Sequence, residues 1–146
     1  MGTGIGIVGS RVAGLNVCFV DPSEASLKKS ETLITKWCDK EISKERMDEK
    51  TKGDVLGRIK FADNISALSD ADFVVEAATE NFNLKKTIFE HLAECTPEHA
   101  ILATNTSSIS ITKIAGVIPP RAHQVIGMHF MNPVPVMKLI EVIKAL

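Results

Sequence analysis

The sequence predicts an α/β protein in which helices pack on a doubly wound, mostly parallel sheet. Short apolar runs such as Asn16–Val20 and Ala100–Thr104 are followed by polar residues, as strands buried on both faces often are. Helical patterns separate these runs along the chain. Strands that alternate with helices form parallel sheets whose two faces the helices cover.

Along the chain, the elements alternate without an internal repeat or a low-complexity linker. The first helix is rich in small apolar residues and glycine, and the short strand that follows it ends at Asp21. Pro22-Ser23-Glu24 then opens a long charged helical region, since proline suits the first turn of a helix. We expect helices at 1–13, 24–52, 84–94 and 111–115, and strands at 16–20, 58–61, 72–77, 100–104, 125–130 and 138–143.

Length and composition are those of a folded domain: 146 residues suffice for one core, and 45% of them are hydrophobic. The net charge of −1 gives no reason to expect a nucleic acid or an anionic membrane as partner, and no apolar run could span a membrane. Helical sequence begins almost at Met1, so we expect no targeting peptide. The three cysteines lack CxxC spacing, which indicates reduced thiols in an intracellular compartment, either the cytoplasm or the mitochondrial matrix. The four histidines include no HExxH pair, so we expect no metal site. These residues are Cys18, Cys38 and Cys95, and His91, His99, His123 and His129.

The stretch from Gly127 to Glu141 carries the most specific chemistry of the chain. His129 follows an apolar run, Asn132-Pro133-Val134-Pro135 comes next, and Glu141 lies inside a second apolar run. Two prolines exclude a continued helix, so strand, turn, strand is expected, which brings the Glu141 carboxylate alongside the His129 ring. Such a pair is a general acid/base unit, because the carboxylate sets the tautomer and stabilises the protonated ring. The alternative is a core histidine that donates to a backbone carbonyl.

Other polar residues follow expected strands, and ligands of parallel sheets bind at the carboxyl ends of strands. Asp21, Glu80 and Ser107 hold such positions. Asp21 either accepts the two ribose hydroxyls of NAD, which selects against the 2′-phosphorylated cofactor, or caps the helix that follows. Ser107 either serves the same site or is a turn residue.

The N-terminal glycines match a phosphate-binding pattern in the wrong place. Gly4-Ile5-Gly6-Ile7-Val8-Gly9 fits GxGxxG, but that fingerprint must follow a strand, and the residues before Gly4 are too few to form one. We interpret Gly4, Gly6 and Gly9 as close-packing positions inside the first helix. Gly2 stands about twenty residues before Asp21, which is the spacing of a fingerprint's final glycine. The first strand and the earlier glycines are then expected upstream of Met1.

The chain resembles the NAD-binding domain of the L-3-hydroxyacyl-CoA dehydrogenase family, which includes 3-hydroxybutyryl-CoA dehydrogenases. The resemblance runs through residues 1–146, and its specific parts are Val74–Ala77 with Glu80-Asn81, Ala103–Ser108 and above all Gly127–Glu141. It implies a Rossmann-like, doubly wound, mostly parallel sheet that lacks its first strand. It also implies oxidation of the 3-hydroxyl of an acyl-CoA, with hydride transfer to NAD, in fatty-acid metabolism.

The resemblance also assigns roles to individual positions. His129 resembles the family's catalytic base, Glu141 its carboxylate partner, and Ser107 the serine that hydrogen-bonds the substrate oxygen near the nicotinamide. Asn132 resembles an asparagine on the nicotinamide side of the pocket, and Asp21 resembles the ribose acid. The other matched positions are Gly2, Glu80 and Lys85 for the cofactor and Lys44 for the CoA moiety. For Lys44 we favour the alternative of a solvated helix face, because many cations surround it in the sequence.

Members of this family are longer at both ends. We therefore expect residues 1–146 to be an NAD-binding domain that is incomplete at its N-terminus. A helical domain is expected beyond Leu146, and through it the full-length enzyme would form homodimers. An acyl-CoA substrate is the expected partner, and the fragment alone is expected to be inactive. A non-catalytic truncated remnant and a nucleotide-binding module of the same fold stay open as alternatives.

Overall fold

The computed structural model describes all residues from Met1 to Leu146. They form two compact units, one of residues Thr3–Asn64 and one that combines Met1–Gly2 with Ile65–Leu146. No helix of either unit has both the length and the apolar character needed to cross a membrane.

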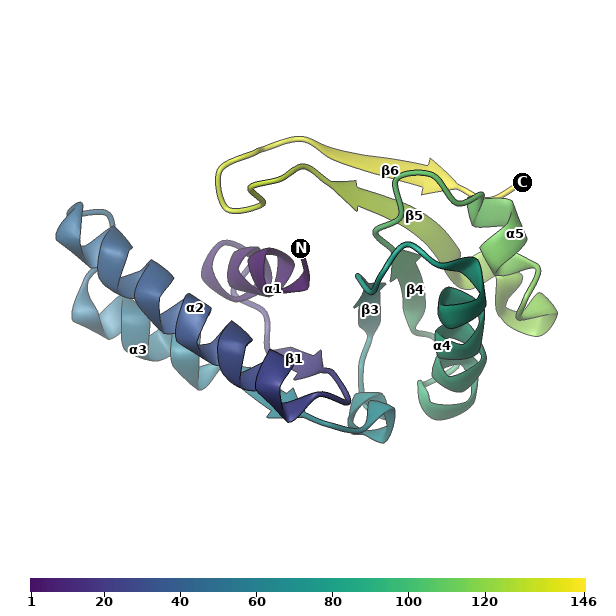
Figure 1. The fold of residues 1–146 in the computed structure, drawn as a ribbon, viewed down its shortest axis with the longest axis horizontal. Helices are drawn as coiled ribbons and strands as arrows, with labels where there is room; N and C mark the ends of the chain where they lie inside the picture. The colour runs from purple at the N-terminus through teal and green to yellow at the C-terminus, as the bar shows by residue number, and fades with distance from the viewer. The chain divides into compact units, whose positions relative to one another are not determined.

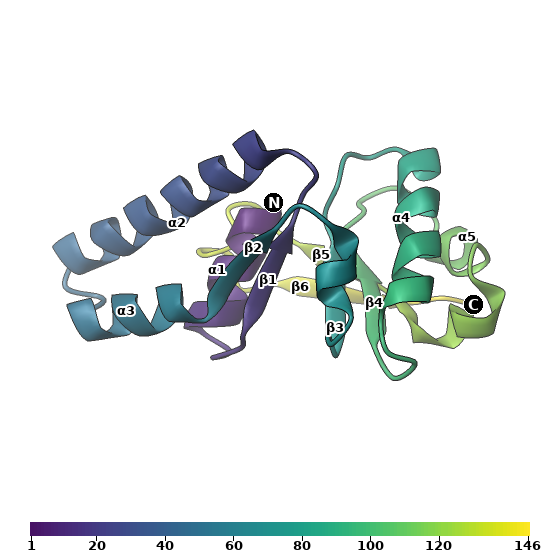
Figure 2. The ribbon, with the colours of Figure 1, turned by 90° about the horizontal axis from the view of Figure 1, so that it is seen from below.

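The unit of residues 3–64 contains a two-stranded parallel sheet and three helices. Strands β1 (Val17–Val20) and β2 (Ile59–Ala62) lie side by side in parallel register (Figure 2). The helices are α1 (Gly2–Arg11), α2 (Glu24–Ser43) and α3 (Glu49–Gly57). The core consists of Ile7, Ile34, Cys38, Met47 and Val55, with Phe19, Trp37, Ile42, Leu56, Ile59 and Phe61 packed against it.

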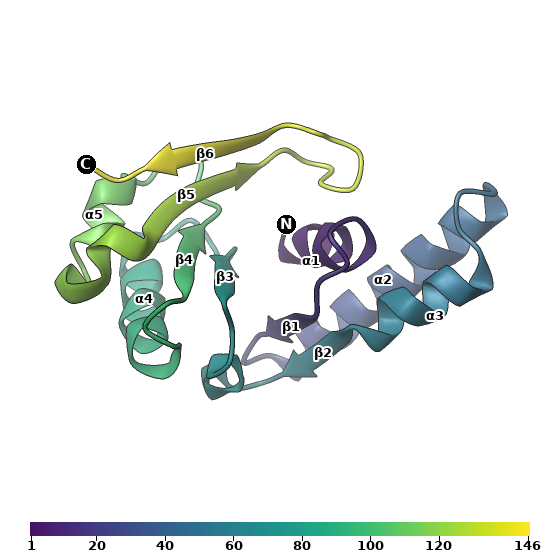
Figure 3. The same ribbon diagram turned by 180° about the vertical axis from the view of Figure 1, so that it is seen from behind.

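The helical region expected to run to about Lys52 is broken into two helices, so that prediction was wrong in this respect. Helix α2 ends at Ser43, and Glu45 then adopts a φ of 58°, in the left-handed region that interrupts a helix. Asp48 starts α3 anew, because its carboxylate accepts the N–H of Thr51 at 2.7 Å. The chain turns between them, and α3 lies beside α2 (Figure 3).

Gly6 lets α1 lie directly against the ring of Phe19. A Cβ at Gly6 would lie 2.0 Å from Cζ of Phe19, and a Cβ at Gly9 would lie 3.3 Å from Cγ2 of Val17. The first distance leaves no room for a side chain, and the second is tighter than an ordinary van der Waals contact. The close-packing interpretation is confirmed for Gly6 and Gly9 and stays a prediction for Gly4.

The unit that contains residues 65–146 is built on a four-stranded sheet. Its strands are, in spatial order, β3 (Phe73–Glu76), β4 (Ile101–Thr104), β5 (Val125–Phe130) and β6 (Ile140–Lys144). The first three run parallel, and β6 runs antiparallel to β5. Helices α4 and α5 lie on one side of this sheet (Figure 1). The helical elements of the unit are η1 (Ile65–Leu68), α4 (Phe82–Cys95), α5 (Ile111–Ala115) and η2 (Pro119–Gln124).

Arg121 connects the end of α4 with the segment that leads into β5. Its guanidinium donates to the carbonyls of Ala93 at 3.0 Å and Pro97 at 2.8 Å, and to the hydroxyl of Thr96 at 2.9 Å. The Ala93 carbonyl lies in the last turn of α4 and lacks a partner within the helix, so the bond from Arg121 satisfies a group that would otherwise need water. The bonds of Arg121 also hold the start of β5, the strand that carries His129.

The prediction of an α/β fold with a mostly parallel sheet is confirmed. Every strand pair is parallel except the pair of β5 and β6. β1 pairs only with β2, and β3 pairs only with β4. Each of these two strands therefore has one edge without a strand partner, and the absence of a strand of the fold from this chain stays a prediction.

Replacing Gly6 by Ala is expected to destabilise the full-length protein, because the Phe19 ring must move to admit a methyl group. Overpacking of this kind costs about 1–3 kcal/mol, which thermal unfolding followed by circular dichroism would show as a lower Tm. Gly53→Ala is the matched control: Gly53 also lies in a helix, but a Cβ there meets no atom within 4 Å. That control should gain about 0.5–1 kcal/mol, and equal shifts in the two variants would contradict the packing of α1 against β1.

Candidate active site

Strands β5 and β6 place His129 and Glu141 directly opposite each other. Their antiparallel register pairs these two residues, and directly opposite side chains of such a pair point to the same face. Nδ1 of His129 lies 2.8 Å from Oε2 of Glu141. The histidine side chain is 25% exposed and the glutamate side chain 53% exposed. The expected hydrogen bond is confirmed, and the partner of this ring nitrogen is a carboxylate rather than a backbone carbonyl.

This contact determines what His129 can do chemically. The contact with the Glu141 carboxylate assigns the ring proton of neutral His129 to Nδ1, because a carboxylate oxygen can only accept a hydrogen bond. Nε2 is then free of a proton and can accept one. A proton taken up at Nε2 would create an imidazolium ion that the carboxylate stabilises. The pair can therefore act as a general base in an oxidation and as a general acid in the reverse reaction.

Residues 131–139 connect the two strands and carry Asn132. The N–H groups of Val136 and Met137 donate to the carbonyl of Pro133 at 2.9 and 3.0 Å, which folds the segment into a turn. Val134 is buried, whereas Asn132 is exposed, and the Asn132–Pro133 peptide bond is cis. Asn132 is thus accessible beside the strand of His129, and its role toward the nicotinamide stays a prediction.

The segment after β4 is hydrogen-bonded to the end of β5. The side-chain oxygen of Asn105 accepts the N–H of Phe130 at 2.8 Å, and Asn105 donates its own N–H to the carbonyl of Glu76 at 2.8 Å. Phe130 follows His129, so Asn105 connects the serine-containing segment to the histidine strand. The sequence did not predict this role of Asn105, because no local pattern reveals a bond between residues that belong to different elements.

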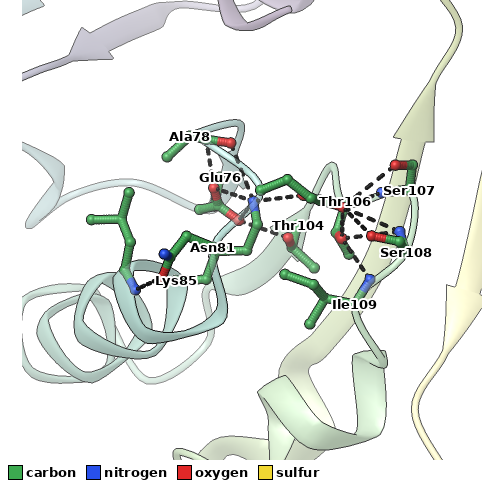
Figure 4. A network of polar contacts seen from close by, with 11 residues as sticks. Glu76, Ala78, Asn81, Lys85, Thr104, Thr106, Ser107, Ser108 and Ile109 are labelled. Atoms are coloured by element: carbon green, nitrogen blue, oxygen red, sulfur yellow. Dashed lines mark hydrogen bonds and ion pairs between the residues drawn. The ribbon is translucent and has the colours of Figure 1, made fainter.

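The carboxylate of Glu80 holds the segment Thr106–Ser108. Its Oε1 accepts the hydroxyl of Thr106 and the backbone N–H groups of Ser107 at 2.9 Å and Ser108 at 3.1 Å. The hydroxyl of Ser108 also donates to this oxygen, at 3.0 Å. The clustering of Thr106, Ser107 and Ser108 is visible in Figure 4.

These bonds have an electrostatic consequence for Glu80. Burial would raise the pKa of its carboxyl, but the hydrogen bonds from Thr106, Ser107 and Ser108 and the charge of Lys85 outweigh burial and lower the pKa from 4.5 to about 2. Because the pKa of Glu80 is lower in the folded protein than in the unfolded chain, ionised Glu80 contributes to stability. The contribution is complete when the pH is above the unfolded pKa of 4.5, and it is lost as the pH falls toward about 2. Glu80 is therefore an anion at any neutral working pH.

A buried ion pair lies next to this segment (Figure 4). The Lys85 ammonium donates to both carboxylate oxygens of Glu76, at 2.8 and 2.9 Å, and to the carbonyl of Ala78 at 3.3 Å. The two side chains are 0% and 2% exposed, and the hydroxyl of Thr104 donates to Glu76 at 2.7 Å. The same ammonium lies 3.6 Å from Oε2 of Glu80.

The surroundings of Lys85 bear on its expected role. Its ammonium is buried and surrounded by protein acceptors in this structure, so its contact with the cofactor stays a prediction.

Glu76 was not among the expected site residues. Glu76 ends an apolar run, and nothing in the sequence around it predicts that it pairs with Lys85, nine residues later in the chain.

Asp21 lies at the carboxyl end of β1, and it is not the N-cap of the helix that follows, which was the alternative to a cofactor contact. The N-cap of α2 is Ser23, whose side chain accepts the N–H of Ser26, whereas Asp21 accepts the N–H of Ser23 at 2.8 Å through Oδ1. A carboxylate has two acceptor oxygens, so Oδ2 can accept a ribose hydroxyl while Oδ1 accepts the N–H of Ser23. Helix α1 has no acidic residue in its first turn, and helix N-termini of this kind favour anions such as a pyrophosphate. These residues fit NAD.

The remaining expected site residues have few contacts. A Cβ at Gly2 would lie 3.7 Å from Cβ of Ala77, an ordinary van der Waals distance, so the structure does not itself require glycine there. Lys44 is exposed at the C-cap of α2 and forms no ion pair, as a solvated helix end would. The roles of both in binding stay predictions.

Comparisons with known proteins show to which family the chain belongs. The family model described as "3-hydroxyacyl-CoA dehydrogenase, NAD binding domain" matches residues 1–146. A 3-hydroxybutyryl-CoA dehydrogenase of Clostridioides difficile is 40% identical, with 96% of this chain and 52% of that protein covered. A 3-hydroxyadipyl-CoA dehydrogenase of Escherichia coli is also 40% identical, with 100% and 30% covered.

A solved structure shows the same fold. The crystal structure of (S)-3-hydroxybutyryl-CoA dehydrogenase PaaH1 from Ralstonia eutropha superimposes with a TM-score of 0.96 at 46% identity and covers 100% of this chain and 51% of that chain. The chain spans 52% and 49% of the first two curated relatives, which is about half of their length. The resemblance inferred from the sequence is confirmed, and the chain belongs to the 3-hydroxyacyl-CoA dehydrogenase family, in which it corresponds to the NAD-binding domain.

Proposed function

We propose that the protein carrying this chain oxidises the 3-hydroxyl of an L-3-hydroxyacyl-CoA to a ketone, with NAD as the hydride acceptor. The observation that carries the proposal is the hydrogen bond of 2.8 Å between Nδ1 of His129 and Glu141, set by the register of β5 and β6. Relatives with similar sequences are named as dehydrogenases of 3-hydroxybutyryl-CoA and 3-hydroxyadipyl-CoA. NAD, when bound, supplies the site that accepts the hydride.

In this reaction the chain's own residues move a proton and stabilise an oxygen. Nε2 of His129 takes the proton of the 3-hydroxyl while the hydrogen on C3 leaves as hydride, so that the C–O single bond becomes a carbonyl. Glu141 stabilises the resulting imidazolium. The Ser107 hydroxyl donates a hydrogen bond to the same substrate oxygen. In the reverse direction, the imidazolium returns the proton to that oxygen.

The proposal includes a partner and an assembly. The substrate is an acyl-CoA, and Lys44 is a candidate contact for its CoA moiety. The full-length enzyme is a homodimer that forms through a helical domain, as the resemblance implies, and it works in an intracellular compartment. Light scattering during size-exclusion chromatography of the full-length protein tests the assembly.

Glu141→Gln in the full-length protein should lower kcat by about 10²–10⁴-fold, because the protonated ring loses its carboxylate partner. The Kd for NAD should change little, since Glu141 acts on the proton and not on the cofactor. The measurement combines NADH absorbance during turnover of 3-hydroxybutyryl-CoA with calorimetric titration of NAD.

A second histidine–carboxylate pair provides the control for this variant. Nε2 of His99 lies 2.9 Å from Oδ1 of Asp72, on side chains that are 65% and 89% exposed. Asp72→Asn removes that pair and should leave kcat unchanged. Equal losses of turnover and NAD affinity in Glu141→Gln would instead indicate a structural role for Glu141.

The position of Asp21 predicts that the full-length enzyme prefers NAD to its 2′-phosphorylated form, because the carboxylate accepts ribose hydroxyls and repels a phosphate. The ratio of kcat/KM for the two cofactors measures this preference, and Asp21→Ala should reduce it. Asp63→Ala is the matched control: Asp63 is an exposed aspartate that directly follows the neighbouring strand β2, and its loss should leave the ratio unchanged. Parity of the two cofactors in the unaltered enzyme would overturn the assignment of Asp21.

Purified residues 1–146 alone should oxidise 3-hydroxybutyryl-CoA negligibly. β1 and β3 each leave one edge without a strand partner, and unpaired backbone groups that become buried cost about 1–3 kcal/mol each. The chain also covers only 52% of the length of a dehydrogenase to which it is similar. NADH absorbance is the assay, and turnover by these residues comparable with that of a full-length enzyme would refute this prediction.

A further inference from the structure

The geometry points to Glu80 as a positioning residue: its carboxylate fixes the backbone that carries Ser107, so that the Ser107 hydroxyl is presented to the substrate oxygen. This inference rests on the proposed function for the role of Ser107. It differs from the cofactor contact that the resemblance implies for Glu80, because here Glu80 acts on the substrate through the protein.

The first support is the number of donors that meet at one oxygen. Oε1 of Glu80 accepts two backbone N–H groups, from Ser107 and Ser108, and three hydroxyls, from Thr106, Ser107 and Ser108. Three consecutive residues are thus folded around one atom. Fixing the N–H of Ser107 restricts its backbone and so the direction of its Cα–Cβ bond, which decides where its hydroxyl can lie.

The Ser107 hydroxyl itself is the donor most weakly held. Its Oγ lies 3.4 Å from Oε1 of Glu80, whereas its backbone nitrogen lies 2.9 Å away. Hydrogen-bond strength falls with distance, so the hydroxyl hydrogen can turn toward a substrate oxygen at little cost while the backbone stays in place. Ser107 is also exposed, as a residue that contacts substrate must be.

The second support is the way in which Glu80 is itself held. Its Oε2 faces the Lys85 ammonium at 3.6 Å, and Lys85 is buried and hydrogen-bonded to Glu76 of β3. One cation thus lies between two carboxylates, one on the sheet and one beside the serine segment. Because Thr104, at the end of β4, also donates to Glu76, the network connects β3, β4, α4 and the segment of Ser107.

The third support is an independent connection at the other end of the segment. Asn105 accepts the N–H of Phe130, the residue after His129. The segment is therefore held by Glu80 on one side and by the histidine strand on the other. The proposed reaction needs the Ser107 hydroxyl as donor and His129 as base at the same substrate oxygen. The two side chains must therefore keep a fixed distance and orientation relative to each other, since small displacements of catalytic groups reduce rates strongly.

The test uses the full-length protein with Glu80→Ala and Glu80→Gln. With Glu80→Ala, kcat should fall by about 10²-fold because Ser107 is no longer held, while the Kd for NAD stays within about twofold of the original value. Hydrogen–deuterium exchange of the peptide that spans residues 104–109 should become faster, since two backbone N–H groups lose their acceptor. Glu80→Gln keeps an acceptor oxygen and should recover part of the protection and part of kcat.

Glu90→Ala is the matched control, because Glu90 lies in helix α4, the helix that directly follows Glu80, and pairs only with the exposed Lys86, at 3.8 Å. It should change neither kcat nor exchange. A Glu80→Ala variant that loses NAD affinity but keeps kcat at saturating NAD would overturn the inference in favour of a cofactor contact. Unchanged exchange at residues 104–109 would also overturn it.

The exchange measurement keeps this inference separate from the proposed function. If the unaltered full-length protein shows no dehydrogenase activity, the proposed function fails. Exchange at residues 104–109 still shows whether Glu80 holds the segment, because it needs neither substrate nor turnover.

Discussion

The register between β5 and β6 is the constraint on which the candidate active site depends. Side chains alternate between the two faces of a strand, so a slip of one residue would move Glu141 to the opposite face from His129. The register is supported by packing as well as by backbone hydrogen bonds. Gly127 lies opposite Ile143, and a Cβ at Gly127 would come within 2.8 Å of Cδ1 of Ile111 in α5. The close approach of α5 to β5 therefore requires glycine two residues before the histidine.

A second constraint is the buried ammonium of Lys85. A charge in the interior is tolerated only when it is paired and hydrogen-bonded, and Lys85 meets this condition through Glu76 and the Ala78 carbonyl. Removing one partner of such a pair typically costs about 3–5 kcal/mol, because the other charge stays buried and unpaired. Loss of either partner would therefore disturb the end of β3, near Glu80 and the Ser107 segment. Glu76 and Lys85 thus affect both the stability of the fold and the arrangement of the candidate site.

Sequence patterns predicted the parts of the structure that depend on local periodicity or on a distinctive motif. The strands, the helix Ile111–Ala115 and the pairing of His129 with Glu141 belong to this class, since two prolines between apolar runs leave few alternatives. The break between α2 and α3 was missed, because Asp48 is one polar residue among many and only its capping bond starts a new helix. Asn105 and Glu76 were missed because their partners lie on other elements. Such contacts follow from the assembled sheet and not from the spacing of residues.

In the proposed reaction, His129 and Ser107 act on the same substrate oxygen, and Glu141 supports the histidine. The most direct measurement is a crystal structure of the full-length protein with NAD and a 3-oxoacyl-CoA. We expect the 3-keto oxygen to lie within hydrogen-bond distance of both Nε2 of His129 and Oγ of Ser107, with Nδ1 still hydrogen-bonded to Glu141. A keto oxygen held by other groups, with Nε2 of His129 facing away from the substrate, would contradict this expectation.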